Sequence, residues 1–355
     1  MEELGFTPFF ASQVDPDRDA GLLPARVVED LGVAWRAWVA DGTERLVRAT
    51  GRLRREGADR GVLPVVGDFV LVRPDRHGDA ATVERVLERR TRLVRRAAGE
   101  RVSEQLLAAN VDVAFLAQSL NRDLNPRRLE RYLVLAREGG VEPVILLTKA
   151  DLCDDPEPLI ALVIAAAGGA PVVVTSVRTE GGVLALSPWL RPAVTVAVLG
   201  SSGVGKSTLI NALLGEERHR TAEIRESDGR GRHTTTTRNL VRLPGGALIV
   251  DTPGMRELGL WETGEALGAV FEDIAALGAS CRFGDCGHES EPGCAVRAAA
   301  QSGRLAPERL ESWRKLRRER AHVEIEQDLA RKSAQERKWR TVNKELRSFY
   351  KKRGR

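Results

Sequence analysis

The sequence predicts an α/β protein built on a doubly wound parallel sheet, and three observations support that prediction. Between Val111 and Val250, short apolar runs alternate with helix-like segments, as parallel strands alternate with crossover helices. One run, Val194–Leu199, leads into a glycine-rich loop and then a helix, which is the context that a phosphate-binding loop requires. From Leu31 to about Thr91, closely spaced β-type runs separated by turn residues indicate a second, smaller barrel domain.

The length and charge of the chain limit the classes of protein it can be. Its 355 residues suit two or three domains. Arg304–Arg355 holds 18 Lys and Arg against 8 Asp and Glu, whereas the rest of the chain holds 37 against 42. A phosphate backbone is the partner that such a basic tail favours. The start lacks the features of a signal peptide, and no apolar run has membrane length, so we expect a cytoplasmic protein that binds no membrane.

The region before the sheet divides into a lead-in and a barrel. Residues 1–30 lack periodicity and carry a DPDRD cluster, so we expect a flexible segment there. Residues 31–95 are expected to form the barrel, and the five-stranded OB-fold is the common nucleic-acid-binding version. Another small β-domain is the alternative at this point. The expected strands are Val33–Val39, Leu46–Leu53, Asp68–Val72 and Ala81–Val86.

The alternating region predicts the order of elements in the sheet. In such sheets ligands bind beyond the carboxyl ends of the strands, and the chemical motifs of this chain all fall at those ends. The expected strands are Val111–Gln118, Val144–Leu147, Val172–Thr175, Val194–Leu199 and Ala247–Val250, and the expected helices are Asn125–Arg137, Leu159–Ala167 and Thr208–Leu214.

Residues 200–207 fit the phosphate-loop pattern G-x-x-x-x-G-K-[ST] at every fixed position. Glycines let backbone N–H groups converge on a phosphate, and the following helix N-terminus adds positive potential. We expect Lys206 to reach the β- and γ-phosphates as a catalytic residue and the Ser207 hydroxyl to ligate Mg²⁺. The expected phosphate-binding residues are Gly200, Ser201, Ser202, Gly203, Val204, Gly205, Lys206, Ser207 and Thr208.

A guanine-recognition pattern, [NT]-K-x-D, closes the strand Val144–Leu147. Thr148, Lys149, Ala150 and Asp151 occupy it. The carboxylate of Asp151 can accept hydrogen bonds from N1–H and the 2-amino group of guanine, whereas adenine offers neither donor. Together with the phosphate loop, this pattern favours GTP over ATP. The residues that end the next strand lie where a backbone N–H could meet the guanine O6: Thr175, Ser176 and Val177.

Residues that would respond to the γ-phosphate follow the phosphate loop. Asp251 begins the sequence DTPG; we expect it to hold Mg²⁺ through water and the Gly254 N–H to contact the γ-phosphate. Between the two motifs lies GRGRHTTTT, in which Thr234 or Thr235 is the expected second Mg²⁺ ligand. Base recognition therefore precedes phosphate binding, the reverse of the usual order in GTPases. The predicted sheet can still close, because only the chain termini move.

A cysteine and histidine cluster follows, with the spacing Cys281-x4-Cys286-x-His288-x5-Cys294. Three thiolates and one imidazole suit closed tetrahedral coordination, so the sequence predicts one structural zinc. Buried thiols beside a surface histidine are the alternative.

Together these features resemble the family of ribosome small-subunit-dependent GTPases A. The sequences GSSGVGKST, GRHTTTT, DTPG and CRFGDCGHESEPGCAV are similar to that family. The resemblance implies a circularly permuted GTPase domain (residues 100–262), an N-terminal OB-fold (residues 31–95) and a C-terminal zinc-binding helical domain (residues 263–330). It implies GTP hydrolysis stimulated by the small ribosomal subunit late in its maturation, and contacts to ribosomal RNA. The resemblance does not extend to the basic tail, residues 331–355, and implies no role for it.

Two positions depart from better-known GTPases. Thr148 stands where many carry asparagine, and losing that amide predicts weaker nucleotide affinity. Met255 stands where Ras-like enzymes place the glutamine that orients water, so we expect slow intrinsic hydrolysis. His233 is the candidate for orienting the attacking water; an RNA contact or plain loop surface is the alternative. We expect a monomer that binds GTP and GDP. A GTPase of another RNA or ribosomal partner, and an RNA-binding protein with nucleotide as a structural ligand, are the rival functions.

Overall fold

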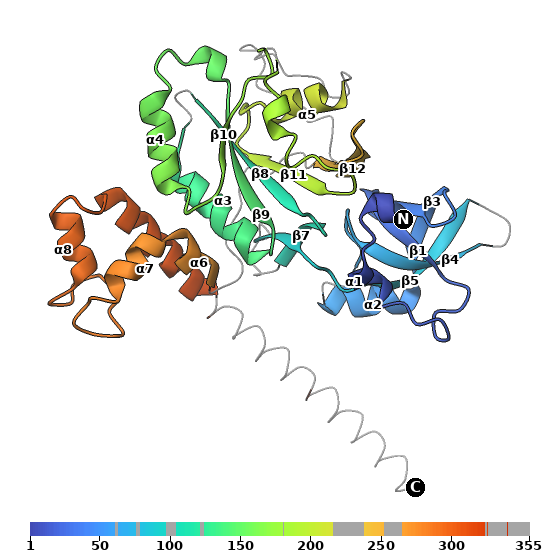
Figure 1. Cartoon of the computed structure of the whole chain (residues 1–355). Coiled ribbons are helices and arrows are strands. Elements are labelled where there is room, and N and C mark those ends of the chain that lie inside the picture. The colour runs from blue at the N-terminus through green and yellow to red at the C-terminus, as the bar shows by residue number, and fades with distance from the viewer. Residues whose placement is uncertain are drawn as a thin grey trace, which may run out of the picture.

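The computed structural model describes residues 1–60, 63–75, 79–96, 104–120, 124–179, 181–215, 238–251 and 265–323, together with Ile325 and Trp339. Figure 1 shows a barrel at the N-terminal end, an α/β domain in the middle and a helical region after it. The α/β fold class and the flanking barrel that the sequence predicts are confirmed. None of the helices in this part of the chain combines the length and apolar character needed to cross a membrane.

Five strands close the N-terminal barrel. β1 pairs with β2 and with β4, β2 pairs with β3, β3 pairs with β5, and β5 pairs with β4, so the five strands form a closed ring. This closure buries one apolar face of each strand, so Val27, Val47 and Val70 have no exposed surface. The strands are β1 (Leu23–Asp30), β2 (Trp35–Val39), β3 (Glu44–Ala49), β4 (Phe69–Pro74) and β5 (Ala80–Val86).

The expected flexible segment over residues 1–30 is wrong. β1 is the strand that completes the barrel, and the residues before it form η1 (Glu2–Leu4) and α1 (Pro8–Ala11). Phe10 is 1% exposed and its ring lies 4.4 Å from that of Phe69 on β4. The contact between Phe10 and Phe69 therefore holds the N-terminal segment against the outside of the barrel. The expected strand Leu46–Leu53 is also shorter, because α2 (Gly51–Arg60) begins after Ala49.

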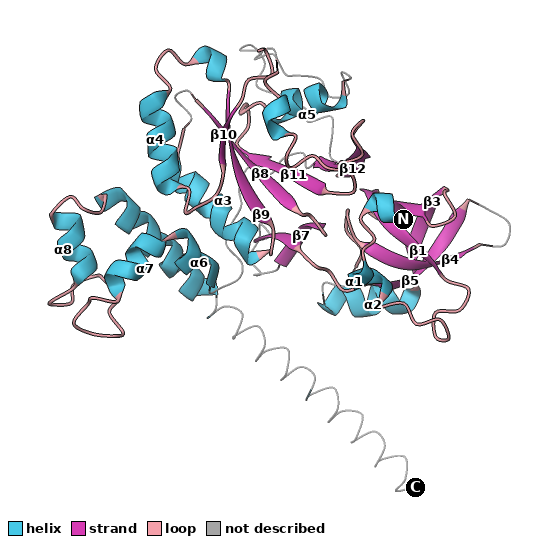
Figure 2. Ribbon diagram, in the orientation of Figure 1, coloured by secondary structure: helices cyan, strands magenta, loops and turns pink. Residues whose placement is uncertain are grey.

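The α/β domain has a parallel sheet with helices on both faces (Figure 2). Its strand order is β10-β9-β8-β11-β13-β12, and all pairs are parallel except β12 with β13. Apolar residues on one sheet face pack with α3, and those on the other pack with α5. The elements are β8 (Val113–Ser119), α3 (Pro126–Glu138), β9 (Glu142–Thr148), η2 (Ala150–Leu152), α4 (Glu157–Ala166), β10 (Val172–Val174), η3 (Leu184–Leu186), β11 (Thr195–Gly200), α5 (Lys206–Leu214), β12 (Asn239–Arg242) and β13 (Leu248–Asp251).

The barrel and the α/β domain share hydrogen bonds. Glu29 of β1 pairs with Asn239 of β12, so among the described residues eleven strands form one continuous sheet. Arg26 of β1 is 1% exposed and donates to Asn110 O (3.2 Å) and to Thr195 Oγ1 (2.8 Å). Burial lowers the pKa of this guanidinium to about 10, which leaves it charged at neutral pH. The ribbon β6 (Arg92–Arg96) and β7 (Glu104–Ala109) lies between the two domains in the chain.

The C-terminal region is helical and is attached to α3. It contains α6 (Glu265–Val270), α7 (Glu272–Gly278), α8 (Ala295–Gln301) and a helix over 307–323. Arg309 of that last helix donates to Glu130 of α3 at 2.8 Å and to both carboxylate oxygens of Asp273 at 2.6 and 2.8 Å. Glu130 is 3% exposed and also accepts from the Ser312 hydroxyl. A charged cluster, buried at Glu130 and Ser312 and exposed at Asp273, therefore joins α3, α7 and the helix over 307–323.

Candidate nucleotide-binding site and metal centre

Two motifs that lie far apart in the chain are in contact at the carboxyl edge of the sheet. The Thr148 hydroxyl at the end of β9 donates to Val204 O in the loop after β11, at 2.7 Å. The neighbouring Lys149 Nζ donates to Gly203 O at 2.6 Å. The parallel pairings of β8 with β9 and with β11 bring these two strand ends together (Figure 1). The two motifs that the sequence predicts for base recognition and phosphate binding therefore lie side by side.

The loop over residues 200–207 has the backbone that a phosphate cradle needs. Gly203 and Gly205 have φ values of 76° and 105°, a region that disfavours side chains. A Cβ on Gly200 would lie 2.7 Å from Ala117 O, so the loop passes close to β8. α5 begins at Lys206 directly after Gly205, and its N-terminal N–H groups add positive potential. Lys206 Nζ donates to Gly200 O (2.8 Å) and Ser201 O (2.6 Å), within the loop that would receive the phosphates.

The base-recognition side of the site is held by hydrogen bonds between two loops. Ser176 Oγ donates to Asp151 Oδ1 at 2.5 Å, which joins the loop after β9 to the loop after β10. Thr175 and Ser176 are 3% and 5% exposed. A Cβ on Gly182 would lie 1.7 Å from Ser176 O, so only glycine lets this loop fold back on itself. The Asp151 carboxylate is thus held in one orientation by Ser176.

Several predicted site residues cannot be placed. His233, Thr234, Thr235 and Gly254 lie outside the described residues. The backbone of Asp251 ends β13 at the same sheet edge, beside β11, but its side chain also lies outside the described part. Ala150, Val177, Ser202, Ser207 and Thr208 lie in the loops and helix start already described.

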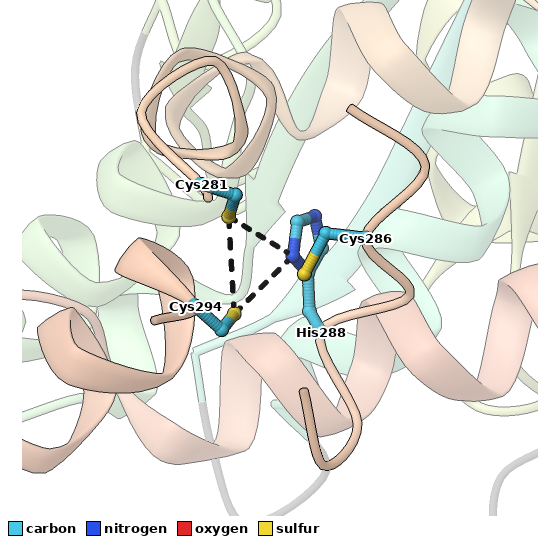
Figure 3. A group of neighbouring side chains, drawn as sticks. All are labelled: Cys281, Cys286, His288 and Cys294. Atoms are coloured by element: carbon cyan, nitrogen blue, oxygen red, sulfur yellow. Dashed lines mark hydrogen bonds between the residues drawn. The ribbon is translucent and has the colours of Figure 1, made fainter. Parts of the chain in front are cut away.

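The four predicted metal ligands are gathered in one cluster (Figure 3). The Sγ of Cys281 lies 3.6 Å and that of Cys294 3.4 Å from His288 Nδ1, and the two sulfurs are 3.9 Å apart. A tetrahedral zinc with usual bond lengths places two sulfurs about 3.8 Å apart and a sulfur and a nitrogen about 3.6 Å apart. With Cys286 included, the four ligand atoms all lie within 4.8 Å of one another. The residues present therefore fit one tetrahedral metal ion.

Burial affects the protonation of two of the four predicted ligands, His288 and Cys286. His288 is 7% exposed and has φ 58°. Burial lowers the pKa of His288, so the imidazole is neutral at pH 7, the form that binds metals. Burial also raises the pKa of Cys286 to about 11, so a cation is needed to hold this thiol as a thiolate at neutral pH.

The loop between two of the ligands is shaped by Glu291. Its carboxylate accepts the backbone N–H groups of Gly287 (2.7 Å), Glu289 (2.8 Å) and Ser290 (3.0 Å). On the other side, Arg317 donates to Gly287 O at 2.9 Å, and Arg314 donates to His288 O. These supporting residues could not be predicted from the sequence, because nothing in the spacing of the ligands indicates them.

Known proteins are similar to this chain over most of its length. The family model described as RsgA GTPase matches residues 86–261. "Small ribosomal subunit biogenesis GTPase RsgA" of Opitutus terrae is 46% identical over 351 residues, 96% of this chain and 95% of the relative. The protein of the same name from Xylella fastidiosa is 49% identical over 298 residues, 83% of this chain and 85% of the relative.

Two solved structures are similar over most of the chain. YjeQ from Thermotoga maritima has a TM-score of 0.63 and 28% identity, covering 84% of this chain and 99% of that one. YloQ, described as a circularly permuted GTPase, has a TM-score of 0.59 and 22% identity, covering 88% of this chain and 98% of that one. The permuted fold that the motif order predicts is thereby confirmed.

Proposed function

The chain belongs to the RsgA GTPase family, and on that premise we propose that it hydrolyses GTP to GDP and phosphate on the small ribosomal subunit, late in the biogenesis of that subunit. The observation that carries this proposal is the contact between the base-recognition sequence and the phosphate loop, through Thr148 with Val204 and Lys149 with Gly203. One nucleotide can span both loops only if they adjoin. The proposal therefore assigns guanine and phosphates to a single site.

The recognition of the base follows from the chemistry of Asp151. Its carboxylate is an acceptor only, and guanine offers two donors, N1–H and the 2-amino group. Ser176 already donates to one of its oxygens, which holds the carboxylate in place. The stem of Lys149, fixed by its bond to Gly203 O, would lie along the base. The proposal thus favours GTP and GDP over adenine nucleotides.

The proposed hydrolysis relies on positioned charge. Lys206 would leave its contacts with Gly200 O and Ser201 O for the β- and γ-phosphates. Ser207, Asp251 and either Thr234 or Thr235 would hold Mg²⁺, which neutralises charge on the phosphates when bound. His233 would orient the attacking water, since Met255 cannot. Intrinsic turnover would then be slow, and the subunit would complete the electrostatic stabilisation.

The Cys281, Cys286, His288 and Cys294 cluster would hold one zinc ion with a structural role. All four positions are protein ligands, which leaves no open position for catalysis. The barrel and the basic helix over 307–323 would contact ribosomal RNA, because their surfaces carry arginines that suit phosphate. We propose that the protein acts as a monomer in the cytoplasm.

The proposal is tested by GTP turnover of the purified protein alone, with small subunits and with large subunits. The expected result is slow turnover alone and a rise with small subunits only. Lys206→Ala is expected to abolish phosphate release in all three conditions. Equal stimulation by both subunits would favour another ribosomal partner, and absence of multiple turnover would favour nucleotide as a structural ligand.

A further inference from the structure

After its first residue, Glu157, the outer face of α4 carries no charge. Val163, Ala166 and Ala167 point into the core, as the 3.6-residue period requires of one helix face. The opposite arc is exposed, and a surface helix ordinarily places polar residues there. In α4 the exposed positions after Glu157 are all apolar: Pro158, Ala161, Leu162, Ile164 and Ala165.

We group this arc with two exposed apolar residues of elements that lie next to α4 in the chain, and call the set the α4 face. Leu162 is 48% and Ile164 58% exposed. Leu152, in η2 just before the helix, is 64% exposed, and Val174, in the edge strand β10, is 40% exposed. Figure 1 shows α4 at the edge of the α/β domain that is farthest from the barrel, consistent with β10 ending the strand order there. Exposed apolar side chains gathered in this way indicate an interaction site.

The charge of the segment that carries the α4 face indicates what binds it. Residues 151–177 contain no lysine or arginine, although the whole chain has 55. The same stretch contains four acidic residues, of which Asp154, Asp155 and Glu157 are exposed at the start of α4. An RNA backbone would be repelled by these carboxylates and would gain nothing from apolar side chains. A protein segment with apolar side chains flanked by lysines and arginines would satisfy both features.

We propose that the α4 face docks a cationic, amphipathic protein segment. The proposal rests on the proposed function, because it makes the partner a protein component of the small subunit. A second copy of this chain fits less well: α4 has ten residues and is about 15 Å long. One face of it falls well short of the about 800 Å² per partner that a stable interface usually buries.

Two variants of one residue separate a protein partner from RNA. Leu162→Glu and Leu162→Lys both remove the apolar contact, and about half of the side chain is already exposed, so neither disturbs the core. Leu184→Glu is the matched control: Leu184 is 70% exposed, and its neighbour Leu186 packs on the other side of the sheet. The dissociation constant for purified small subunits is measured for each with a non-hydrolysable GTP analogue.

The proposal predicts a rise of about tenfold or more in that constant for both variants, with Leu162→Lys the weaker binder and Leu184→Glu unchanged. Tighter binding by Leu162→Lys would show that RNA faces this surface and overturn the proposal. Unchanged binding by both variants would overturn it as well.

The partner is identified by photo-crosslinking. A benzophenone amino acid replaces Leu162, or Leu184 in the control, and the small-subunit complex is irradiated. Adducts from position 162 to a basic segment of a subunit protein support the proposal. Adducts to RNA, to a second copy of the chain, or none at all overturn it. If the unmodified protein fails to bind small subunits, the proposed function fails and this proposal with it; if it binds but these results are contrary, only this proposal fails.

Discussion

Replacing Thr148 by valine tests whether the base and phosphate loops work as one unit. The substitution keeps the shape of the side chain and removes its hydroxyl, which donates to Val204 O at 2.7 Å and lies 3.3 Å from Gln118 O. Thr148 is 7% exposed, so water cannot replace the lost donor. A buried neutral hydrogen bond contributes about 0.5–1.5 kcal/mol, and leaving its partner unsatisfied costs about 1–3 kcal/mol.

That loss is expected to appear in nucleotide affinity. Without the bond, only a fraction of the molecules hold the two loops in the arrangement that binds nucleotide. The apparent dissociation constant rises as that fraction falls. A loss of about 1–3 kcal/mol corresponds to a rise of about 5-fold to 150-fold. The assay is titration of a fluorescent GDP analogue, with the thermal midpoint of the free protein measured in parallel.

Thr148→Ser is the matched control, because it keeps the hydroxyl and loses only a methyl group. It is expected to bind GDP less than about fivefold more weakly than the unmodified protein, since one methyl group is worth less than about 1 kcal/mol. If Thr148→Val binds GDP as tightly as the unmodified protein, the bond to Val204 does not couple the loops and the reasoning is refuted.

Two further predictions concern the C-terminal region. Arg309→Met leaves Glu130 buried with one partner fewer, at a cost of about 3–5 kcal/mol, so amide exchange in the helix over 307–323 should accelerate at least about a hundredfold. Arg131→Met breaks a partly exposed pair with Glu319 and should change that exchange less than about fivefold. Equal effects of the two substitutions would contradict the special role of the buried Glu130. The second follows from Glu291, whose pKa is lowered to about 2 by its own backbone N–H and those of the loop before it. The ionised carboxylate stabilises the fold at pH values above the ordinary carboxyl pKa, and this stabilisation is lost as pH falls toward 2. The thermal midpoint of Glu291→Gln should therefore lie furthest below that of the unmodified protein near pH 7, and the difference should become smaller below about pH 4.5. A difference that does not change with pH would contradict this prediction.

The motifs could be predicted from the sequence because their spacing is set by chemistry. The phosphate loop needs glycines at set positions before Lys206 and Ser207, and the metal site needs four ligands close together in the chain. The strand and helix on either side of the phosphate loop could be predicted for a related reason: Val196 and Val198 lie in a strand buried on both faces and form an apolar run.

The missed features depend on distant parts of the chain. β1 reads LPARVVED, with Pro24 near its start, Arg26 in its middle and two acidic residues at its end, and only the closed barrel and the α/β domain around Arg26 make it a buried strand. The expected strand Leu46–Leu53 runs into the first turn of α2, because its residues alone are of β type; the Thr50 hydroxyl accepts from Leu53 N and favours a helix start at Gly51 instead. The contact of Glu130 with Arg309 spans 179 positions and leaves no local pattern.

The most direct test of the single nucleotide site is the base preference of Asp151→Asn. An asparagine amide donates where the carboxylate accepts, so it should reject the 2-amino group of guanine and bind the 2-carbonyl of xanthine. Turnover of GTP and XTP with small subunits is measured for the unmodified protein and the variant. We predict that the variant loses turnover of GTP and gains turnover of XTP; a variant that keeps its preference for GTP would show that Asp151 does not recognise the base.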